Sequence, residues 1–315
     1  MLFFSQHGSS QQILESYVKQ EGSIQIGPGK KDFMPLNEKG YSLILPESKE
    51  NLQGVIIALD EGRFDPKDST LLTFYQFANA KGFALLHISS GIPFDLYFKE
   101  KSLSEADNVI KTVLNKYQIP NKNIFLLGIS ISGIRALKYV VYCNTGKSEF
   151  HADIKGVVLC DSAIDWIRQY MEEEKGLRDK FSESSVSEAK WVMWQFNKNL
   201  KGTPKTNREA YLQYSPYSRF DESNRYIRYY KDISIRAYSE PATMYWMEKK
   251  GKGVYETNFP DMVGIVNEVR LAGNKKAELI VFSKERAMDQ PHNPYATWEL
   301  VDKRELVDWI ARQVN

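Results

Sequence analysis

The sequence contains few of the residues that build disulfide scaffolds and metal sites. Its 315 residues include two cysteines, Cys143 and Cys160, and four histidines. Both cysteines follow short apolar runs, as buried thiols commonly do. No Cys-x-x-Cys pair suggests a zinc site. The sequence therefore excludes a disulfide-rich scaffold, and we expect neither a metal ion nor an organic cofactor.

The chain also lacks a long apolar run and an excess of charge of one sign. No apolar stretch reaches the ~18 residues that suggest a membrane span, so we expect none. Lysine and arginine total 42 and aspartate and glutamate 40, which gives a net charge of +2. This balance indicates neither nucleic acid nor an anionic membrane as a partner, and a small-molecule substrate is expected instead. The compartment and the oligomeric state stay open; the protein could be cytoplasmic, or exported with its leader already removed.

Apolar runs alternate with amphipathic segments over most of the chain. Runs such as 54–59 and 83–88 are uniformly apolar, which is typical of strands buried on both faces of a parallel sheet. The alternation predicts an α/β fold, a mostly parallel central sheet flanked by helices. The predicted strands are 41–45, 54–59, 83–88, 123–128, 156–160, 233–238 and 277–282. The predicted helices are 9–20, 71–78, 102–117, 132–142, 261–272 and a last helix after Asp302.

One interval departs from this alternation. Between Ser162 and Asp232, roughly 70 residues separate two predicted strands, too many for a loop without structure. The interval predicts a helical insertion at 163–231, rich in tryptophan and tyrosine. Its acidic run 172–175 is expected to be a solvent-exposed helix face. The chain would then consist of residues 1–40 as an N-terminal helix and loops, 41–162 and 232–315 as the core, and the insertion.

The segment Gly-Ile-Ser-Ile-Ser-Gly at 128–133 lies between a predicted strand and a predicted helix. A serine among small residues in that setting is typical of a nucleophile elbow, in which a tight turn exposes the hydroxyl. The pattern predicts that Ser130 projects above the strand ends. The N–H of Ile131, near the helix start, would face a developing oxyanion. The alternative is a plain tight turn, and Ser132 stands where the motif usually has glycine.

On these features the chain resembles the α/β-hydrolase family over roughly residues 41–313. In that family the acid and the histidine follow the serine in chain order. Only His151 and His292 follow Ser130. His151 precedes a predicted strand and so lies at the wrong edge of the sheet, because sites lie at the carboxyl ends. The resemblance therefore implies His292, after the last predicted strand, as the general base.

The same resemblance places the acid after the strand that precedes the histidine's strand. Glu240 occupies that position and would orient the imidazole. Asp161, after the preceding strand, is the alternative used by some members of the family. Asp261 and Asp289 are outside candidates.

The resemblance also assigns the second oxyanion donor and a cap. The donor would be the N–H of Gly62 or Arg63, in the loop after the strand at 54–59. Esterases of the family often carry His-Gly there, whereas this chain has Asp60-Glu61-Gly62, and Arg63 could neutralise Glu61. The insertion would cover the site. Three of its tyrosines are expected to line the substrate pocket: Tyr211, Tyr214 and Tyr217.

These residues together predict a serine hydrolase that cleaves a carboxylic ester, or an amide, through an acyl-enzyme on Ser130. The alternative is a non-catalytic binding protein of the same fold for a small molecule, which the unusual Asp60-Glu61-Gly62 loop favours. A nucleotide-binding Rossmann protein is disfavoured, because no Gly-x-Gly-x-x-Gly follows the early strands.

Overall fold

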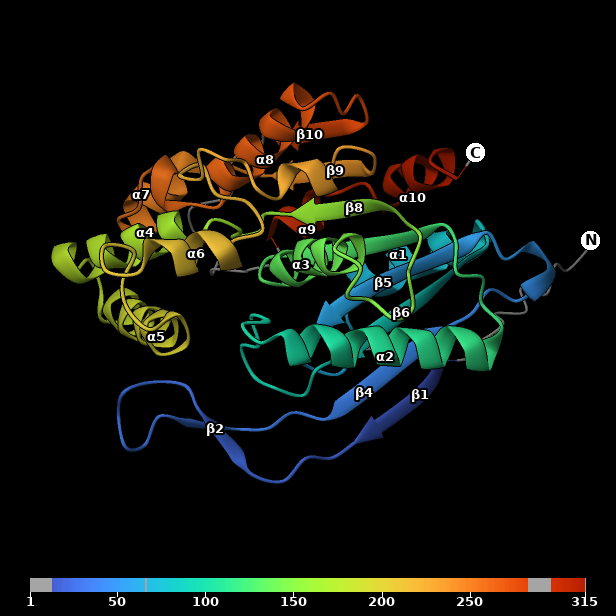
Figure 1. The fold of residues 1–315 in the computed structure, drawn as a ribbon, viewed down its shortest axis with the longest axis horizontal. Coiled ribbons are helices and arrows are strands. Elements are labelled where there is room, and N and C mark those ends of the chain that lie inside the picture. The colour runs from blue at the N-terminus through green and yellow to red at the C-terminus, as the bar shows by residue number, and fades with distance from the viewer. Residues whose placement is uncertain (1–12, 66, 283–295, 315) are drawn as a thin grey trace, which may run out of the picture.

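The computed structural model describes residues 13–65, 67–282 and 296–314 (Figure 1). At its centre is an eight-stranded sheet with the order β1-β4-β6-β5-β7-β8-β9-β10. The pairings from β6 across to β10 are parallel, whereas β4 runs antiparallel to both β1 and β6. The strands are β1 (Ile13–Val18), β4 (Lys39–Ile44), β5 (Gly54–Asp60), β6 (Phe83–Ser89), β7 (Ile124–Ile129), β8 (Ile154–Cys160), β9 (Ser234–Ser239) and β10 (Ala277–Val281). The predicted α/β fold with a mostly parallel sheet is confirmed.

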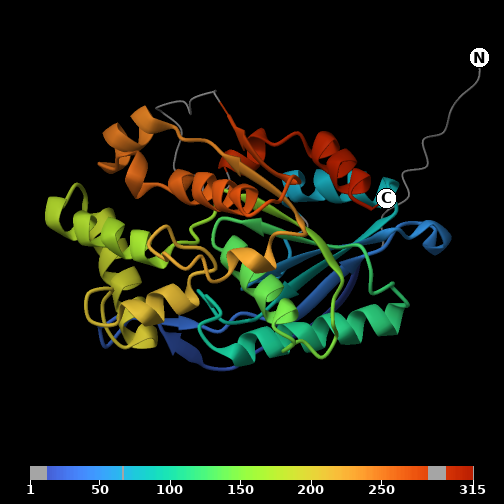
Figure 2. The ribbon, with the colours of Figure 1, turned by 45° about the horizontal axis from the view of Figure 1, so that its top comes forward.

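Helices cover both faces of this sheet (Figures 1 and 2). One face packs against α2 (Glu100–Tyr117), α3 (Ser132–Asn144) and α8 (Phe259–Leu271). The other packs against α1 (Ser69–Ala80), α9 (Ala296–Leu300) and α10 (Lys303–Arg312). The central strands therefore lie between two apolar layers, which explains why their sequences are apolar without alternation.

The N-terminal part differs from the prediction. A helix was expected over 9–20, but Ile13–Val18 form strand β1, so that prediction is wrong for the described part. Short apolar segments fit helical and extended spacing almost equally, and tertiary pairing decides between them. Here β4 offers backbone groups that need partners, and Ser42 Oγ adds a hydrogen bond of 2.8 Å to Glu15. The following segment forms a small hairpin of β2 (Ser23–Gln25) and β3 (Phe33–Pro35), with a 3-10 turn after β4 (Lys49–Asn51).

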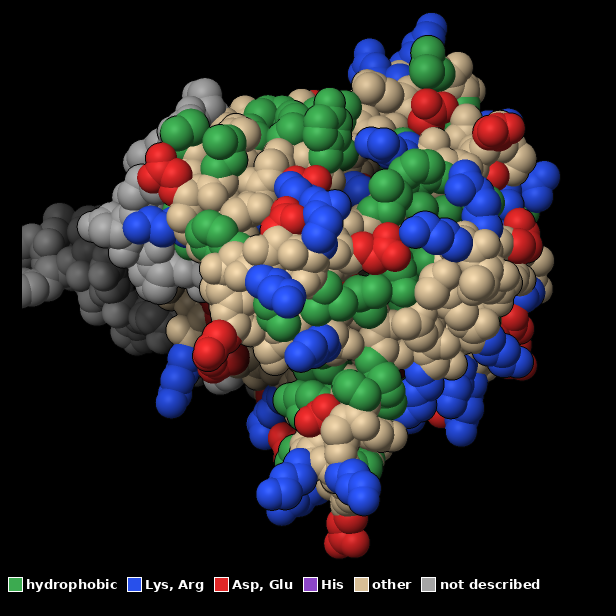
Figure 3. Space-filling view, turned by 90° about the vertical axis from the view of Figure 1, so that its left-hand side faces the viewer, with side chains coloured by type: hydrophobic (Ala, Val, Ile, Leu, Met, Phe, Trp, Pro, Cys, Tyr) green, Lys and Arg blue, Asp and Glu red, His purple; other side chains and the backbone are tan. Residues whose placement is uncertain are grey.

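The interval between β8 and β9 is helical, as the sequence indicates. It contains α4 (Trp166–Asp179), α5 (Glu183–Leu200), α6 (Arg208–Tyr214) and a 3-10 turn (Ile227–Tyr229). A shorter helical stretch between β9 and β10 lies beside it, made of α7 (Thr243–Lys250) and a 3-10 turn (Val254–Glu256). On the outer face of this end of the molecule, apolar side chains lie among charged ones (Figure 3).

The acidic run in α4 is not the exposed face that was expected. Glu172 and Glu173 are only 7% and 3% exposed. Arg168 pairs with Glu172 at 2.9 Å, and Lys252 pairs with it at 2.5 Å. Charged residues can be buried when they are paired in this way. The spacing of the carboxylates alone does not reveal that one partner, Lys252, comes from a distant segment of the chain.

This burial predicts a pH-dependent stability. Burial raises the pKa of Glu173 to about 8, with a smaller contribution from the neighbouring Glu172 carboxylate. The folded state therefore binds this proton more tightly than the unfolded state does. The stability that protonated Glu173 contributes is fully present below about pH 4 and is lost as the pH rises through 8. We expect Glu173→Gln to become more stable relative to the wild type between pH 5 and pH 8, measured by urea midpoints. Glu174→Gln, whose carboxylate is 40% exposed, is the matched control, and an equal trend there would contradict the prediction.

Candidate active site

The turn between β7 and α3 holds Ser130 in an unusual backbone conformation. Its φ is +53°, in the left-handed region that residues with a side chain seldom occupy. Its N–H donates to the Cys160 carbonyl of the neighbouring strand at 2.8 Å, which fixes the turn against β8. Such strain is retained where the surroundings over-determine the conformation, and it concentrates at functional sites.

Small residues around Ser130 are required by close contacts. A Cβ at Gly128 would lie 2.4 Å from Cα of Gly133, and a Cβ at Gly133 would lie 2.1 Å from Oγ of Ser162. Ser132, which replaces the usual glycine, is buried, and its Oγ bonds both the N–H and the carbonyl of Ile129, at 2.7 and 2.8 Å. The Ser132 hydroxyl, which glycine would lack, therefore stabilises the turn through two hydrogen bonds.

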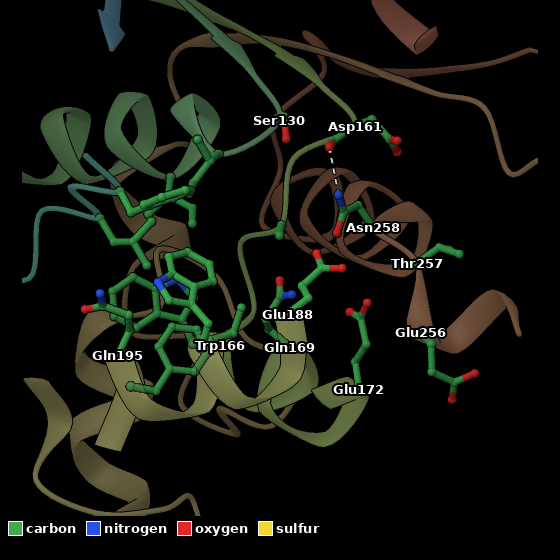
Figure 4. Close-up of a pocket in the computed structure, with 18 of the residues that line it drawn as sticks. Ser130, Asp161, Trp166, Gln169, Glu172, Glu188, Gln195, Glu256, Thr257 and Asn258 are labelled. Atoms are coloured by element: carbon green, nitrogen blue, oxygen red, sulfur yellow. Dashed lines mark hydrogen bonds between the residues drawn. The ribbon is translucent and has the colours of Figure 1, made fainter. Parts of the chain in front are cut away.

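Ser130 faces a cavity of 380 Å³ between the carboxyl ends of the strands and the inserted helices (Figure 4). Its volume lies within the range of pockets for small molecules. Five aromatic side chains contribute to its wall: Phe94, Trp166, Trp191, Phe196 and Trp246. Across from Ser130, polar side chains of α4 and α5 point into the cavity: Gln169, Glu172 and Glu188.

The three tyrosines expected in the pocket are not among its described lining residues. Tyr211 is fully buried inside the inserted helices, where its hydroxyl donates to the Gly202 carbonyl at 2.9 Å. Tyr217 is buried against α8, close to Gly264, and Tyr214 lines a different cavity. Both tryptophan and tyrosine occur at helical spacing in this interval, so the sequence does not show which aromatic residues turn inward.

The acid candidates follow neighbouring strands. Glu240 comes directly after β9 and is only 4% exposed. Asp161 follows β8 and lines the cavity, but its carboxylate points away from Ser130 and accepts from Ser239 Oγ at 2.9 Å (Figure 4). Asp261 is engaged elsewhere, since it pairs with Arg168 at 2.5 Å. His292 and Asp289 lie outside the described residues.

The predicted oxyanion donors differ in their surroundings. Ile131 lines the cavity and precedes α3, where backbone N–H groups have no acceptor within the helix. The Gly62 carbonyl bonds Nε2 of His87 at 3.0 Å, and open space surrounds the position of a Cβ. Arg63 pairs with Glu15 and Glu38 on the surface, so its side chain does not neutralise Glu61.

Arg135 of α3, and not Arg63, compensates the charge of Glu61, which the sequence did not lead us to expect. Its side chain is fully buried and lies 3.1 Å from Glu61 and 3.4 Å from Asp60. Glu61 lines the cavity and also accepts from the Phe94 N–H at 2.7 Å. Burial raises the pKa of Glu61, and Arg135 opposes that rise. The available signal was an arginine inside an apolar helix, together with two adjacent carboxylates that need a partner.

Two further features of the described residues concern ligands and membranes. No group of three or more His, Cys, Asp and Glu side chains within 13–65, 67–282 and 296–314 is arranged to hold a metal ion. None of the helices in this part of the chain has the length and apolar character needed to cross a bilayer.

Solved structures of other proteins share the fold of this chain. No protein-family model matches the sequence, and no curated protein matches it significantly. The structure is similar to acylaminoacyl peptidase from Pyrococcus horikoshii, with a TM-score of 0.54 and 16% identity over 96% of this chain. It is also similar to an esterase from Pyrobaculum calidifontis (TM-score 0.54, 13% identity, 96% of this chain and 85% of the esterase). Carboxyl esterase 2 from Tuber melanosporum gives a TM-score of 0.55 at 10% identity over 98% of this chain and 88% of the esterase.

The chain spans 41% of the length of the peptidase and most of the length of the two esterases. These similarities extend over almost the whole chain. The protein has the α/β-hydrolase fold.

Proposed function

We propose that the protein is a serine hydrolase that cleaves a carboxylic ester, with an amide as the second choice. The observation that carries the proposal is the strained Ser130, exposed to a cavity at the carboxyl edge of the sheet. A serine needs a neighbouring base to act as a nucleophile. His292 is proposed as that base and Glu240 as its partner, on their positions after β10 and β9.

In the proposed reaction, Ser130 Oγ attacks the acyl carbonyl while His292 accepts its proton. Glu240 holds the imidazole and stabilises its cation. The N–H of Ile131, with that of Gly62 or Arg63, stabilises the negative oxygen of the tetrahedral intermediate. His292 then protonates the leaving group, and water releases the acyl group from Ser130. This chemistry uses protein groups and water alone.

The choice of substrate rests on the cavity and on the similar structures. Those structures include esterases and an acylaminoacyl peptidase, and this chain covers far more of the esterases' length. The aromatic wall suits a substrate with an apolar or aromatic group. We propose residues 163–231 as the cap that supplies this wall, through Trp166, Trp191 and Phe196.

One observation favours a second candidate, a non-catalytic protein that binds a small molecule in the same cavity. Glu61 occupies the loop from which the second oxyanion donor would come, and its carboxylate lines the cavity. A negative charge there opposes the development of an oxyanion. Arg135 compensates only in part, because it also contacts Asp60.

Labelling with a fluorophosphonate distinguishes the two candidates. We expect the probe to modify the wild type at Ser130, located by peptide mass spectrometry, and Ser130→Ala to remain unlabelled. Ser184→Ala, which alters an exposed serine of α5, is the control and should label like the wild type. A wild type that is inert to the probe and to small activated esters would contradict the hydrolase proposal and favour the binding protein.

A further inference from the structure

A second cavity lies beside α2, α3 and α6, apart from the one that Ser130 faces. Its volume is 200 Å³, and its wall includes Tyr97, Leu103, Val141 and Tyr226. This volume is below the roughly 300–1,000 Å³ of pockets for drug-sized ligands. The cavity can therefore hold only a small ligand, largely in contact with aromatic and aliphatic side chains.

Lys138 of α3 lines this cavity, and its ammonium group contacts mainly aromatic rings. Its Nζ lies 4.5 Å from the ring centre of Tyr214 and 5.1 Å from that of Trp166, and the two rings are nearly parallel. Its one protein acceptor among the described residues is the Tyr214 carbonyl, at 3.3 Å. An ammonium has three donors, so this arrangement leaves two for a ligand.

The charges around the cavity leave Lys138 without a counter-ion in the described part of the chain. The cavity wall carries two lysines and one carboxylate, and Lys147 already pairs with that carboxylate, Glu100. Asp95 acts on Lys138 only from beyond ion-pair distance; its Oδ1 accepts from the Tyr97 N–H at 2.9 Å, and its buried Oδ2 has no hydrogen-bond partner among the described residues. Burial lowers the pKa of Lys138 to about 7, which reflects the cost of a desolvated charge.

We propose that this cavity is a binding site for a small organic monoanion, a carboxylate, whose charge pairs with Lys138. The carboxylate would accept hydrogen bonds from the two remaining N–H groups of the ammonium. Such charge-assisted hydrogen bonds are stronger than those between neutral groups. The organic part would pack against Tyr97, Leu103 and Val141. The site does not depend on the chemistry proposed for Ser130, although Trp166 contacts Lys138 and also lines the first cavity.

Benzoate is the probe that we would titrate first, by calorimetry at pH 7. We expect Lys138→Met to weaken its binding roughly tenfold or more, as the loss of hydrogen bonds to a charged group does. Lys138→Arg should retain most of the affinity, and neutral benzamide should bind the wild type no better than it binds Lys138→Met. Lys198→Met is the matched control, because Lys198 also lies over a tryptophan, 4.4 Å from the ring centre of Trp194, but does not line the second cavity.

The location of binding needs a separate measurement, because benzoate could also enter the aromatic cavity beside Ser130. Trinitrobenzenesulfonate labels neutral amines, and peptide mass spectrometry reads Lys138 and Lys198 in one sample. We expect benzoate to protect Lys138 and not Lys198.

Unchanged labelling of Lys138 at saturating benzoate would overturn the proposal, as would equal affinities of the wild type and Lys138→Met. Tighter binding of inorganic phosphate than of benzoate would also overturn it. Loss of fluorophosphonate labelling in Ser130→Ala bears on the hydrolase proposal alone.

Discussion

Replacing Glu240 with Gln is expected to lower kcat for ester hydrolysis by about 10⁴, the size of effect seen when the acid of a triad becomes an amide. Glu240 lies directly after β9, and the residue is only 4% exposed. If Glu240 is the acid as proposed, an amide there keeps the shape of the site but cannot stabilise the imidazolium of His292. The measurement is kcat with an activated ester, alongside a thermal melt to confirm folding.

Asp161→Asn is the matched control, because Asp161 is the alternative candidate for the acid. The Asp161 carboxylate accepts from Ser239 and points away from Ser130, so the variant should keep kcat close to that of the wild type. The reverse pattern, a severe loss in Asp161→Asn with Glu240→Gln still active, would reassign the acid to Asp161. Ser130 and His292 would keep their proposed roles in that case.

Replacing Arg135 with Met is expected to cost about 3 kcal/mol in the free energy of unfolding, at the low end of the range for breaking a buried ion pair. The guanidinium is fully buried, and without it Asp60 and Glu61 would face each other with no cation between them. The low end applies because both carboxylates keep some contact with water. Urea unfolding at pH 7 measures the effect.

Arg63→Met is the matched control for this prediction. Arg63 also pairs with two carboxylates, but its side chain is 48% exposed, and surface pairs of this kind contribute little. We expect its urea midpoint to stay near that of the wild type. Equal losses in the two arginine variants would show that burial of Arg135 is not what stabilises the loop. If the hydrolase proposal holds, Arg135→Met should also lower kcat, because Glu61 would then carry its charge uncompensated into the cavity.

Periodicity predicted most of the core but failed at the edge of the sheet. Strands such as β7 are apolar on both faces and lie in the centre, so local sequence and tertiary environment agree. At residues 13–18 the pattern fits two periods, and pairing with β4 settles the choice. The pairing partner lies in another segment of the chain, so the sequence of residues 13–18 alone cannot predict the strand.

The site was predictable where a local constraint creates it. The turn at Ser130 requires small residues at fixed offsets, which a reader of the sequence can recognise. Arg135, by contrast, matters because α3 brings it to Asp60, which lies 75 residues earlier in the chain. The side chains that line the cavity from α4 and α5 depend on how two helices turn about their axes. Their aromatic residues occur on more than one face, so composition could not select among them.

The placement of the inserted helices has an evolutionary consequence. They lie in the crossover from β8 to β9, two strands that are direct neighbours in the sheet and need a connection of some length in any case. The entropic cost of lengthening a loop grows only with the logarithm of its length, by about 0.6 kcal/mol per doubling. Helices can therefore be added, lost or exchanged at this point while the strands beneath keep their pairing. Descendants of this scaffold can change what they recognise without rebuilding the turn that holds Ser130.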